Sequence, residues 1–209
     1  MFDCTFVTAP NQVFCPCGTT GALIYAALYG GELSRKSRVL DLCTGAGLVA
    51  IVLSANVPGM LVEGVDVSWD AIQLARHNNS VNETEVDFHH MDVFGGWKNQ
   101  LHNKNGKGFN LITANPPYWG EEIVGDARNK MAKCNPIGAL LGGKDGMDFH
   151  RRIVDEAVYF LAPEGRLCLE MDPRQEEKIR HLLRDNFHEP RIYKDYRGVN
   201  RAISAEIDF

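Results

Sequence analysis

The chain has 209 residues, a formal net charge of −5 at pH 7 and 44% apolar residues, a composition typical of a globular protein. At this length we expect one domain, residues 1–209. No run of about 18 apolar residues is present, which excludes a membrane-spanning helix. The acidic excess argues against a broad nucleic-acid-binding face. Six scattered cysteines and the lack of a secretory signal predict a cytoplasmic protein.

Segments typical of strands and helices alternate along the chain. We expect strands at 38–42, 60–67, 85–88, 109–114, 166–171, 191–194 and 202–207, and helices at 20–29, 48–55, 148–161, after Ser68 and from Pro173. This order predicts an α/β fold with a seven-stranded, mostly parallel sheet and helices on both faces. The last two strands are separated by only a turn, which predicts an antiparallel edge.

Three further segments are assigned by composition and position. One is predicted to be a solvated insertion, and the other two are predicted to lie on the substrate side. Residues 98–108 are rich in Asn, Lys and Gly and are predicted to be a solvated insertion. Residues 119–148 contain a long stretch without periodicity, and a connection of that length is usually functional. We therefore expect a substrate loop there, with residues 1–31 forming an N-terminal substrate-side segment and helix.

A glycine-containing loop follows the first expected strand and opens a helix, reading Asp41-Leu-Cys43-Thr44-Gly45-Ala-Gly47. Glycines let a backbone approach a ligand closely, and ligands of open parallel sheets bind at the carboxyl ends of strands. The alternative is a simple tight turn between strand and helix. Ala50 stands where a dinucleotide-binding loop carries its third glycine. This difference weakens the interpretation of the loop as a dinucleotide-binding site.

Two acids follow later strands. Asp66 ends the second expected strand, where an acid typically accepts hydrogen bonds from ribose hydroxyls; the alternative is an acid that only caps the next helix. Asp92 follows the third strand and could face an adenine amino group, although a solvated loop acid is an equal alternative.

The sequence Asn115-Pro116-Pro117-Tyr118 follows the fourth expected strand. An amide or aromatic amine has a delocalised lone pair, and two acceptors that bind its N–H groups would turn that lone pair toward an electrophile. The Asn115 side-chain oxygen and the Pro116 carbonyl are such a pair, and proline fixes the backbone that carries them. Tyr118 could stack on a flat group. The alternative is a proline-rich turn with an asparagine cap.

No metal site is expected. Cys15 and Cys17 make only two of the ligands that a zinc site needs. His89 and His90 are adjacent on a strand, so their side chains point to opposite faces.

Taken together, these motifs resemble class I S-adenosylmethionine-dependent methyltransferases of the Asn-Pro-Pro-Tyr group, and within it the HemK/PrmC protein-glutamine methyltransferases. The resemblance runs from Val13 onwards. It also includes residues 139–153, which are similar to a stretch characteristic of HemK/PrmC, and 197–201, which resemble the C-terminal segment of that family.

The resemblance implies a Rossmann-like fold, S-adenosylmethionine as cofactor and a set of site residues. Asn115, Pro116 and Tyr118 would be catalytic, and Pro117, Trp119 and Thr20 would contact substrate. The implied cofactor-binding residues are Asp41, Cys43, Thr44, Gly45, Gly47, Asp66, Val67, Asp92, Val93 and Asn115. The reaction would be an in-line displacement without metal or covalent intermediate.

Two departures fall on the substrate side. The N-terminal helical domain of the bacterial glutamine methyltransferases is expected to be absent, and the segments around Cys15 and Asn135 differ from the family pattern. Three acceptors therefore stay open: a protein glutamine such as that of a release factor, which the resemblance favours; a small-molecule amine or amide; and adenine in nucleic acid, which the net charge disfavours. A cofactor-binding partner subunit without activity is disfavoured because both motifs are complete. The oligomeric state is left open.

Overall fold

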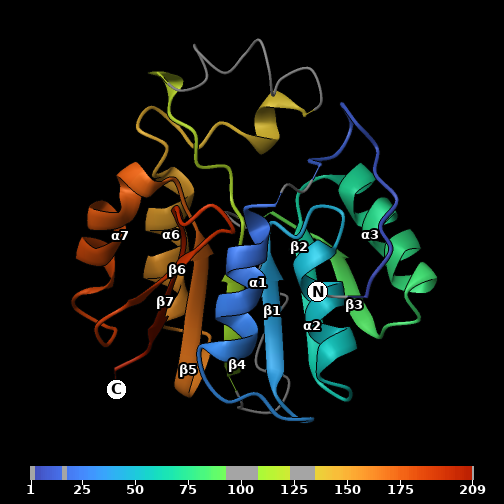
Figure 1. Ribbon diagram of the computed structural model, residues 1–209, viewed down its shortest axis with the longest axis horizontal. Coiled ribbons are helices and arrows are strands. Elements are labelled where there is room, and N and C mark those ends of the chain that lie inside the picture. The colour runs from blue at the N-terminus through green and yellow to red at the C-terminus, as the bar shows by residue number, and fades with distance from the viewer. Residues whose placement is uncertain (1–2, 16–17, 93–107, 123–134, 209) are drawn as a thin grey trace.

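The structure is a computed structural model that describes residues 3–15, 18–92, 108–122 and 135–208 (Figure 1). Most of the predicted insertion at 98–108 and the centre of the predicted substrate loop lie outside the described residues. No helix among the described residues is long and apolar enough to cross a membrane.

The described strands form one seven-stranded sheet in the order β3-β2-β1-β4-β5-β7-β6. The first five are parallel, while β7 runs antiparallel to both β5 and β6, which confirms the predicted mostly parallel sheet and its antiparallel edge. The strands are β1 (Arg38–Leu42), β2 (Leu61–Asp66), β3 (Val86–His90), β4 (Phe109–Ala114), β5 (Leu161–Glu170), β6 (Arg191–Lys194) and β7 (Asn200–Glu206).

Helices cover both faces of the sheet, as predicted (Figure 1). The helices are α1 (Thr20–Tyr29), α2 (Leu48–Asn56), α3 (Trp69–Val81), α6 (Asp148–Ala157) and α7 (Glu176–Leu183), with 3₁₀ turns η1 (Ile137–Ala139) and η2 (Pro173–Gln175). The alternation of side chains along a strand divides the interior into two cores. In β1, Val39 belongs to the core under α1 and α2, whereas Leu40 and Leu42 belong to the core under α6 and α7.

One element differs clearly from the sequence prediction. The helix expected over 148–161 ends at Ala157, and Leu161 already begins β5, five residues before the expected strand. Leu161 continues the apolar stripe of the helix, but it pairs with Phe109 in the sheet, and the backbone N–H of Phe109 donates to the carbonyl of Phe160 at 2.7 Å. Pro163 and Gly165 lie within this strand at a shift of its register rather than at a helix end.

The other differences are small. The helix expected from Pro173 starts as the 3₁₀ turn η2 before α7, β3 ends two residues later than expected and β7 begins two residues earlier. Element ends routinely differ by this much because terminal hydrogen bonds are the weakest.

The order of the strands brings together residues that the chain separates. β1 and β4 are neighbours at the centre of the sheet, where the direction of strand order reverses. Ligands of such folds bind outside the carboxyl ends of the strands at this point. These ends carry the glycine loop after β1, Asp66 at the end of β2 and Asn115 after β4.

Candidate active site

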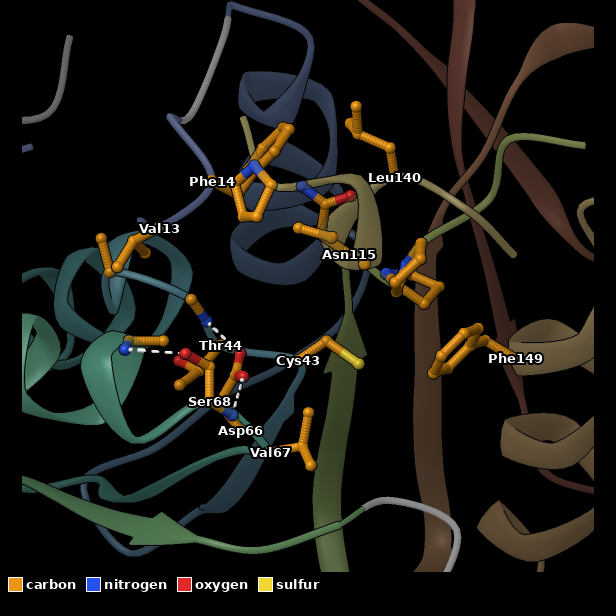
Figure 2. Close-up of a pocket in the computed structure, with 18 of the residues that line it drawn as sticks. Val13, Phe14, Cys43, Thr44, Asp66, Val67, Ser68, Asn115, Leu140 and Phe149 are labelled. Atoms are coloured by element: carbon orange, nitrogen blue, oxygen red, sulfur yellow. Dashed lines mark hydrogen bonds between the residues drawn. The ribbon is translucent and has the colours of Figure 1, made fainter. Parts of the chain in front are cut away.

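A cavity of about 320 Å³ opens at the carboxyl ends of β1, β2 and β4 (Figure 2), within the usual size of small-ligand sites. The structure brings most of the predicted site residues to this one cavity. Those that line it are Thr20, Asp41, Cys43, Thr44, Gly45, Asp66, Val67, Asp92, Asn115, Pro116, Pro117, Tyr118 and Trp119. Gly47 does not line it, and Val93 lies outside the described residues. We refer to the loops after β1 and β2 as the cofactor side of the cavity. We refer to its remaining walls as the acceptor side.

Asp41 holds the glycine loop in shape on the cofactor side. Its carboxylate is 1% exposed and accepts hydrogen bonds from the hydroxyls of Thr44 and Thr113, both at 2.6 Å. Burial raises the pKa of Asp41 to about 6, against the opposing effect of the two hydroxyls. Both carboxylate oxygens thus accept a hydrogen bond from the protein, and Asp41 fixes the loop where it borders the cavity.

The two glycines of the loop have different roles. Both have positive φ, 55° at Gly45 and 84° at Gly47, a conformation that disfavours other residues. A Cβ at Gly45 would meet nothing within 4 Å, whereas one at Gly47 would lie 2.9 Å from the ring of Phe88. Gly45 therefore leaves room beside the cavity, and Gly47 allows α2 to begin close to the sheet.

Asp66 joins the two loops of the cofactor side. One carboxylate oxygen accepts from the backbone N–H of Gly45 at 2.8 Å and the other from that of Ser68 at 2.9 Å (Figure 2). Each carboxylate oxygen has a second lone pair, so Asp66 can still accept hydrogen bonds from ligand hydroxyls. Burial raises its pKa, against the effect of these backbone donors.

The charge of the cavity matches S-adenosylmethionine. Asp41, Asp66 and Asp92 line it, and within the described parts of the chain no Lys or Arg does. Carboxylates suit the hydroxyls and the positive charge of that cofactor, whereas a polyphosphate would need cations. The open space at Gly45 and the free lone pairs of Asp66 complete a set of groups that fits the cofactor.

Cys43 is also part of this wall, and its surroundings disfavour the thiolate form. Burial, together with the charges of Asp66, Asp41 and Asp92, raises the pKa of its thiol well above the ordinary value. The reactive form of cysteine is the thiolate, so Cys43 contributes an apolar surface instead.

Asn115 extends from the end of β4 into the acceptor side (Figure 2). Its side-chain Nδ2 donates to the hydroxyl oxygen of Thr20 at 3.4 Å, which is long for a hydrogen bond. With the nitrogen facing Thr20, the Oδ1 atom is left as an acceptor for a ligand. Pro116 and Pro117 restrict the backbone that follows.

Next to Tyr118 lies a buried carboxylate that the sequence analysis did not single out. Glu170 at the end of β5 is fully buried and accepts hydrogen bonds from the hydroxyls of Thr19, at 3.1 Å, and Tyr118, at 3.2 Å. Burial raises the pKa of Glu170 to about 7. A single acid within the apolar strand sequence 167–171 was the signal that could have identified it.

The two predicted substrate-side segments meet above the cavity. Val13 and Phe14 reach it from the N-terminal segment and Leu140 from the end of η1, while Phe149 reaches it from α6 (Figure 2). The backbone N–H of Cys15 donates to the side-chain oxygen of Asn135 at 2.8 Å, and the N–H of Trp119 donates to the carbonyl of Leu140 at 2.8 Å. Sequence reasoning did not identify Phe14, Leu140 or Phe149 as lining residues.

The residues considered for metal binding do not assemble in the described parts of the chain, where no group of three His, Cys, Asp or Glu side chains could hold an ion. His90 contacts the carbonyl of Val67 at 2.8 Å, whereas His89 lies 3.6 Å from Glu63. Cys17 lies outside the described residues.

The cavity joins a glycine loop, an acidic strand end and an Asn-Pro-Pro-Tyr loop. Comparison with known protein families identifies the family in which the chain belongs. The model of the family described as "Methyltransferase small domain" matches residues 20–199. The chain belongs to the methyltransferase small domain family.

Its relatives include proteins named "Release factor glutamine methyltransferase". The chain is 32% identical over 199 residues to one from Deinococcus radiodurans, covering 95% of this chain and 68% of that protein. It is 31% identical over 169 residues to one from Thermodesulfovibrio yellowstonii, covering 80% of this chain and 58% of that protein. The chain therefore spans little more than half of the latter's length. These matches confirm the predicted family, HemK-like class I methyltransferases.

The fold is also shared with solved structures. A methyltransferase from Pyrococcus furiosus superimposes with a TM-score of 0.68 at 16% identity, covering 99% of this chain and 90% of that one. This likeness supports the class I methyltransferase fold and carries no information on substrate.

Proposed function

We propose that this chain is an S-adenosylmethionine-dependent methyltransferase that acts on a planar amide or amine nitrogen. The observation that carries the proposal is the meeting of Asn115 and Pro116 with the glycine loop and Asp66 in one cavity. A cofactor and a flat acceptor would face each other there, which is what a direct transfer requires.

The cofactor side, together with Asp92 after β3, would hold S-adenosylmethionine. Asp66 would bind the ribose hydroxyls, Val67 and Asp92 would border the adenine, and the loop from Cys43 to Gly45 would hold the methionine part. The cofactor, when bound, would supply a methyl group activated by the positive sulfur, and breaking the bond between sulfur and methyl carbon would leave S-adenosylhomocysteine as product. The protein adds positioning and an acidic surrounding for that charge.

The acceptor side would orient the attacking nitrogen. In an amide the nitrogen lone pair is shared with the carbonyl, so a hydrogen bond from each N–H to a fixed acceptor is needed to direct it. We assign these acceptors to Asn115 Oδ1 and the Pro116 carbonyl. Tyr118, Pro117 and Trp119 would hold the flat group against the loop, and the proton would leave to solvent after methylation.

A protein glutamine is the acceptor that we favour, because the relatives at about 30% identity carry the name of that activity. A small-molecule amine or amide is the second candidate, since the chain departs from the family pattern at Cys15 and Asn135, and these residues join the two segments above the cavity. Adenine in nucleic acid is the least favoured, because no cation from the described residues lines the cavity.

Intact-mass analysis of a bacterial peptide-chain release factor, incubated with the protein and S-adenosylmethionine, tests this proposal. We expect the factor to gain the mass of one CH₂ unit, located by fragmentation on a glutamine. An unchanged release factor, together with a methylated metabolite in a cell extract, would replace the protein substrate by a small molecule. Absence of methyl transfer to any acceptor would contradict the proposal as a whole.

A further inference from the structure

The first described segment of the chain, residues 3–15, reaches the cavity, and we call it the N-terminal strap. Its residue Val13 is 3% exposed and forms one apolar cluster with Ala46 of the glycine loop and Ala71 in the first turn of α3. Figure 2 shows Val13 on the same side of the cavity as Thr44. The strap therefore borders the cofactor side as well as the acceptor side.

Two asparagine side chains hold the beginning of the strap. Asn78, near the end of α3, accepts from the backbone N–H of Val7 at 2.8 Å and donates to the carbonyl of the same residue at 3.2 Å. One turn later, Asn82 makes the same pair of hydrogen bonds to Thr5, both at 2.8 Å. Backbone groups of an extended segment are usually paired by a neighbouring strand, and here two side-chain amides take its place.

The two amides differ in their third hydrogen bond. Asn82 Nδ2 also donates to the backbone carbonyl of Asn78 at 2.7 Å, whereas Asn78 Nδ2 also donates to the carbonyl of Ala46 at 3.0 Å. Ala46 lies between the two glycines of the glycine loop. Asn78 is fully buried, where leaving a polar group without a partner is costly. Its amide therefore ties the strap and the glycine loop to one point on α3.

A tight turn connects the anchored part of the strap to the part that lines the cavity. The backbone N–H groups of Gln12 and Val13 both donate to the carbonyl of Ala9, at 3.1 and 3.0 Å. This turn lies only two residues after Val7, so the place of Val13 above the glycine loop depends on where Asn78 holds the chain.

We propose that Asn78 is a positioning residue for the cofactor, which holds the N-terminal strap and the glycine loop together so that they enclose S-adenosylmethionine from two sides. The inference rests on the proposed function for the identity of the ligand. Because the bridge fixes both segments before the ligand arrives, it should strengthen cofactor binding. It should have no part in the transfer of the methyl group itself.

Calorimetric titration with S-adenosylmethionine tests the bridge through a matched pair of variants. We expect Asn78→Ala to bind the cofactor about tenfold more weakly, because the strap and the glycine loop lose their common partner. Asn82→Ala removes an equivalent pair of hydrogen bonds to Thr5 but keeps the bridge, so its affinity should change by less than about twofold. If Asn78→Ala does not fold, Asn78→Ser should weaken binding in the same direction.

Hydrogen exchange in the unsubstituted protein is a second measurement, which needs no variant. Cofactor binding should slow the exchange of backbone amides in the strap and in residues 44–47 together, since both segments would border the ligand. In Asn78→Ala the strap should lose its response to the cofactor, whereas in Asn82→Ala it should keep it.

A kinetic measurement separates positioning of the cofactor from a general structural role. With the release factor as acceptor, Asn78→Ala should raise the KM for S-adenosylmethionine about tenfold and keep kcat within about twofold, because saturation with the cofactor compensates for the weaker binding. A kcat that falls with KM unchanged would contradict the positioning role.

The outcomes distinguish this inference from the proposed function. Equal cofactor affinities of Asn78→Ala and Asn82→Ala, or a strap whose exchange does not respond to the cofactor, would overturn the inference even if methyl transfer is observed. Absence of cofactor binding to the unsubstituted protein would contradict the proposed function and with it the assigned ligand. The bridge itself would still be supported if, without cofactor, residues 44–47 exchanged faster in Asn78→Ala and not in Asn82→Ala.

Discussion

On the cofactor side of the cavity, most hydrogen bonds join the loops of two adjacent strand ends, with one bond from Thr113 on β4 to Asp41, whereas on the acceptor side α1 is joined to residues far along the chain. Thr44 and Asp41 are 3 residues apart, and Gly45 and Asp66 are 21 apart. Asn115 and Thr20 are 95 apart, and Thr19 and Glu170 are 151 apart. The cofactor side is thus built mainly from two neighbouring strand ends and is held by Thr113 of the adjacent β4, while the acceptor side depends on contacts between α1 and the later strands. Changes on the two sides should have separable effects.

The largest effect is expected for Asn115→Ala. Removing the side-chain acceptor should lower methyl transfer to the release factor by about 100-fold or more, because the nitrogen is no longer oriented. The affinity for S-adenosylmethionine, measured by its thermal stabilisation of the protein, should be unchanged. Asn56→Ala, at the far end of α2, is the control and should keep full activity. Retained activity in Asn115→Ala would remove the assigned acceptor role.

The next effect is a pH dependence of stability that originates on the acceptor side. The pKa of Glu170 is raised from the ordinary 4.5 to about 7 in the folded protein, so the folded state retains a proton that the unfolded state has lost. Its contribution to the free energy of unfolding is complete below the ordinary pKa and is lost as the pH rises to about 7.

Urea unfolding at a pH below and a pH above this window measures the effect. The loss of stability between the two should be smaller in Glu170→Gln, by up to about 3 kcal/mol. Asp41 titrates in an overlapping window, since its pKa is raised to about 6, but it is present in both proteins and cancels in the comparison. An equal loss of stability in both proteins would contradict a raised pKa of Glu170 in the folded protein.

On the cofactor side, Asp66→Asn should weaken binding of S-adenosylmethionine about tenfold to hundredfold. An amide keeps only one of the two acceptor oxygens, and its nitrogen would face the N–H of Gly45 or Ser68. Calorimetric titration measures the affinity, and Asp155→Asn on the exposed face of α6 is the control. If the affinity were unchanged while the release-factor KM rose, Asp66 would belong to the acceptor side.

The smallest effect is expected where the two substrate-side segments meet. Asn135→Ala removes the acceptor of the Cys15 N–H, a loss of about 1 kcal/mol that should raise the release-factor KM a few-fold and leave cofactor affinity alone. Asn82→Ala removes a similar 2.8 Å bond from the N–H of Thr5 at residues that do not line the cavity. Equal effects of both variants would mean that the N-terminal segment acts as a whole rather than through Asn135.

The same contrast explains what could be predicted from the sequence. The cofactor side follows from one continuous motif and the next strand end, so the sequence could predict that Asp41, Gly45 and Asp66 lie together at one cavity. Glu170 could not, because its partners lie far away in the chain and only the strand order brings them together. The end of α6 was misplaced for a related reason, since Leu161 fits the helical stripe and its pairing with Phe109 is a tertiary contact.

The central claim is that the cavity binds S-adenosylmethionine on a cofactor side that does not depend on the acceptor groups. Calorimetric titration of the unsubstituted protein with S-adenosylmethionine tests it most directly. We predict saturable binding of one cofactor per chain, retained in Asn115→Ala and weakened in Asp66→Asn. No detectable binding, or binding that depends on Asn115 and not on Asp66, would contradict the account.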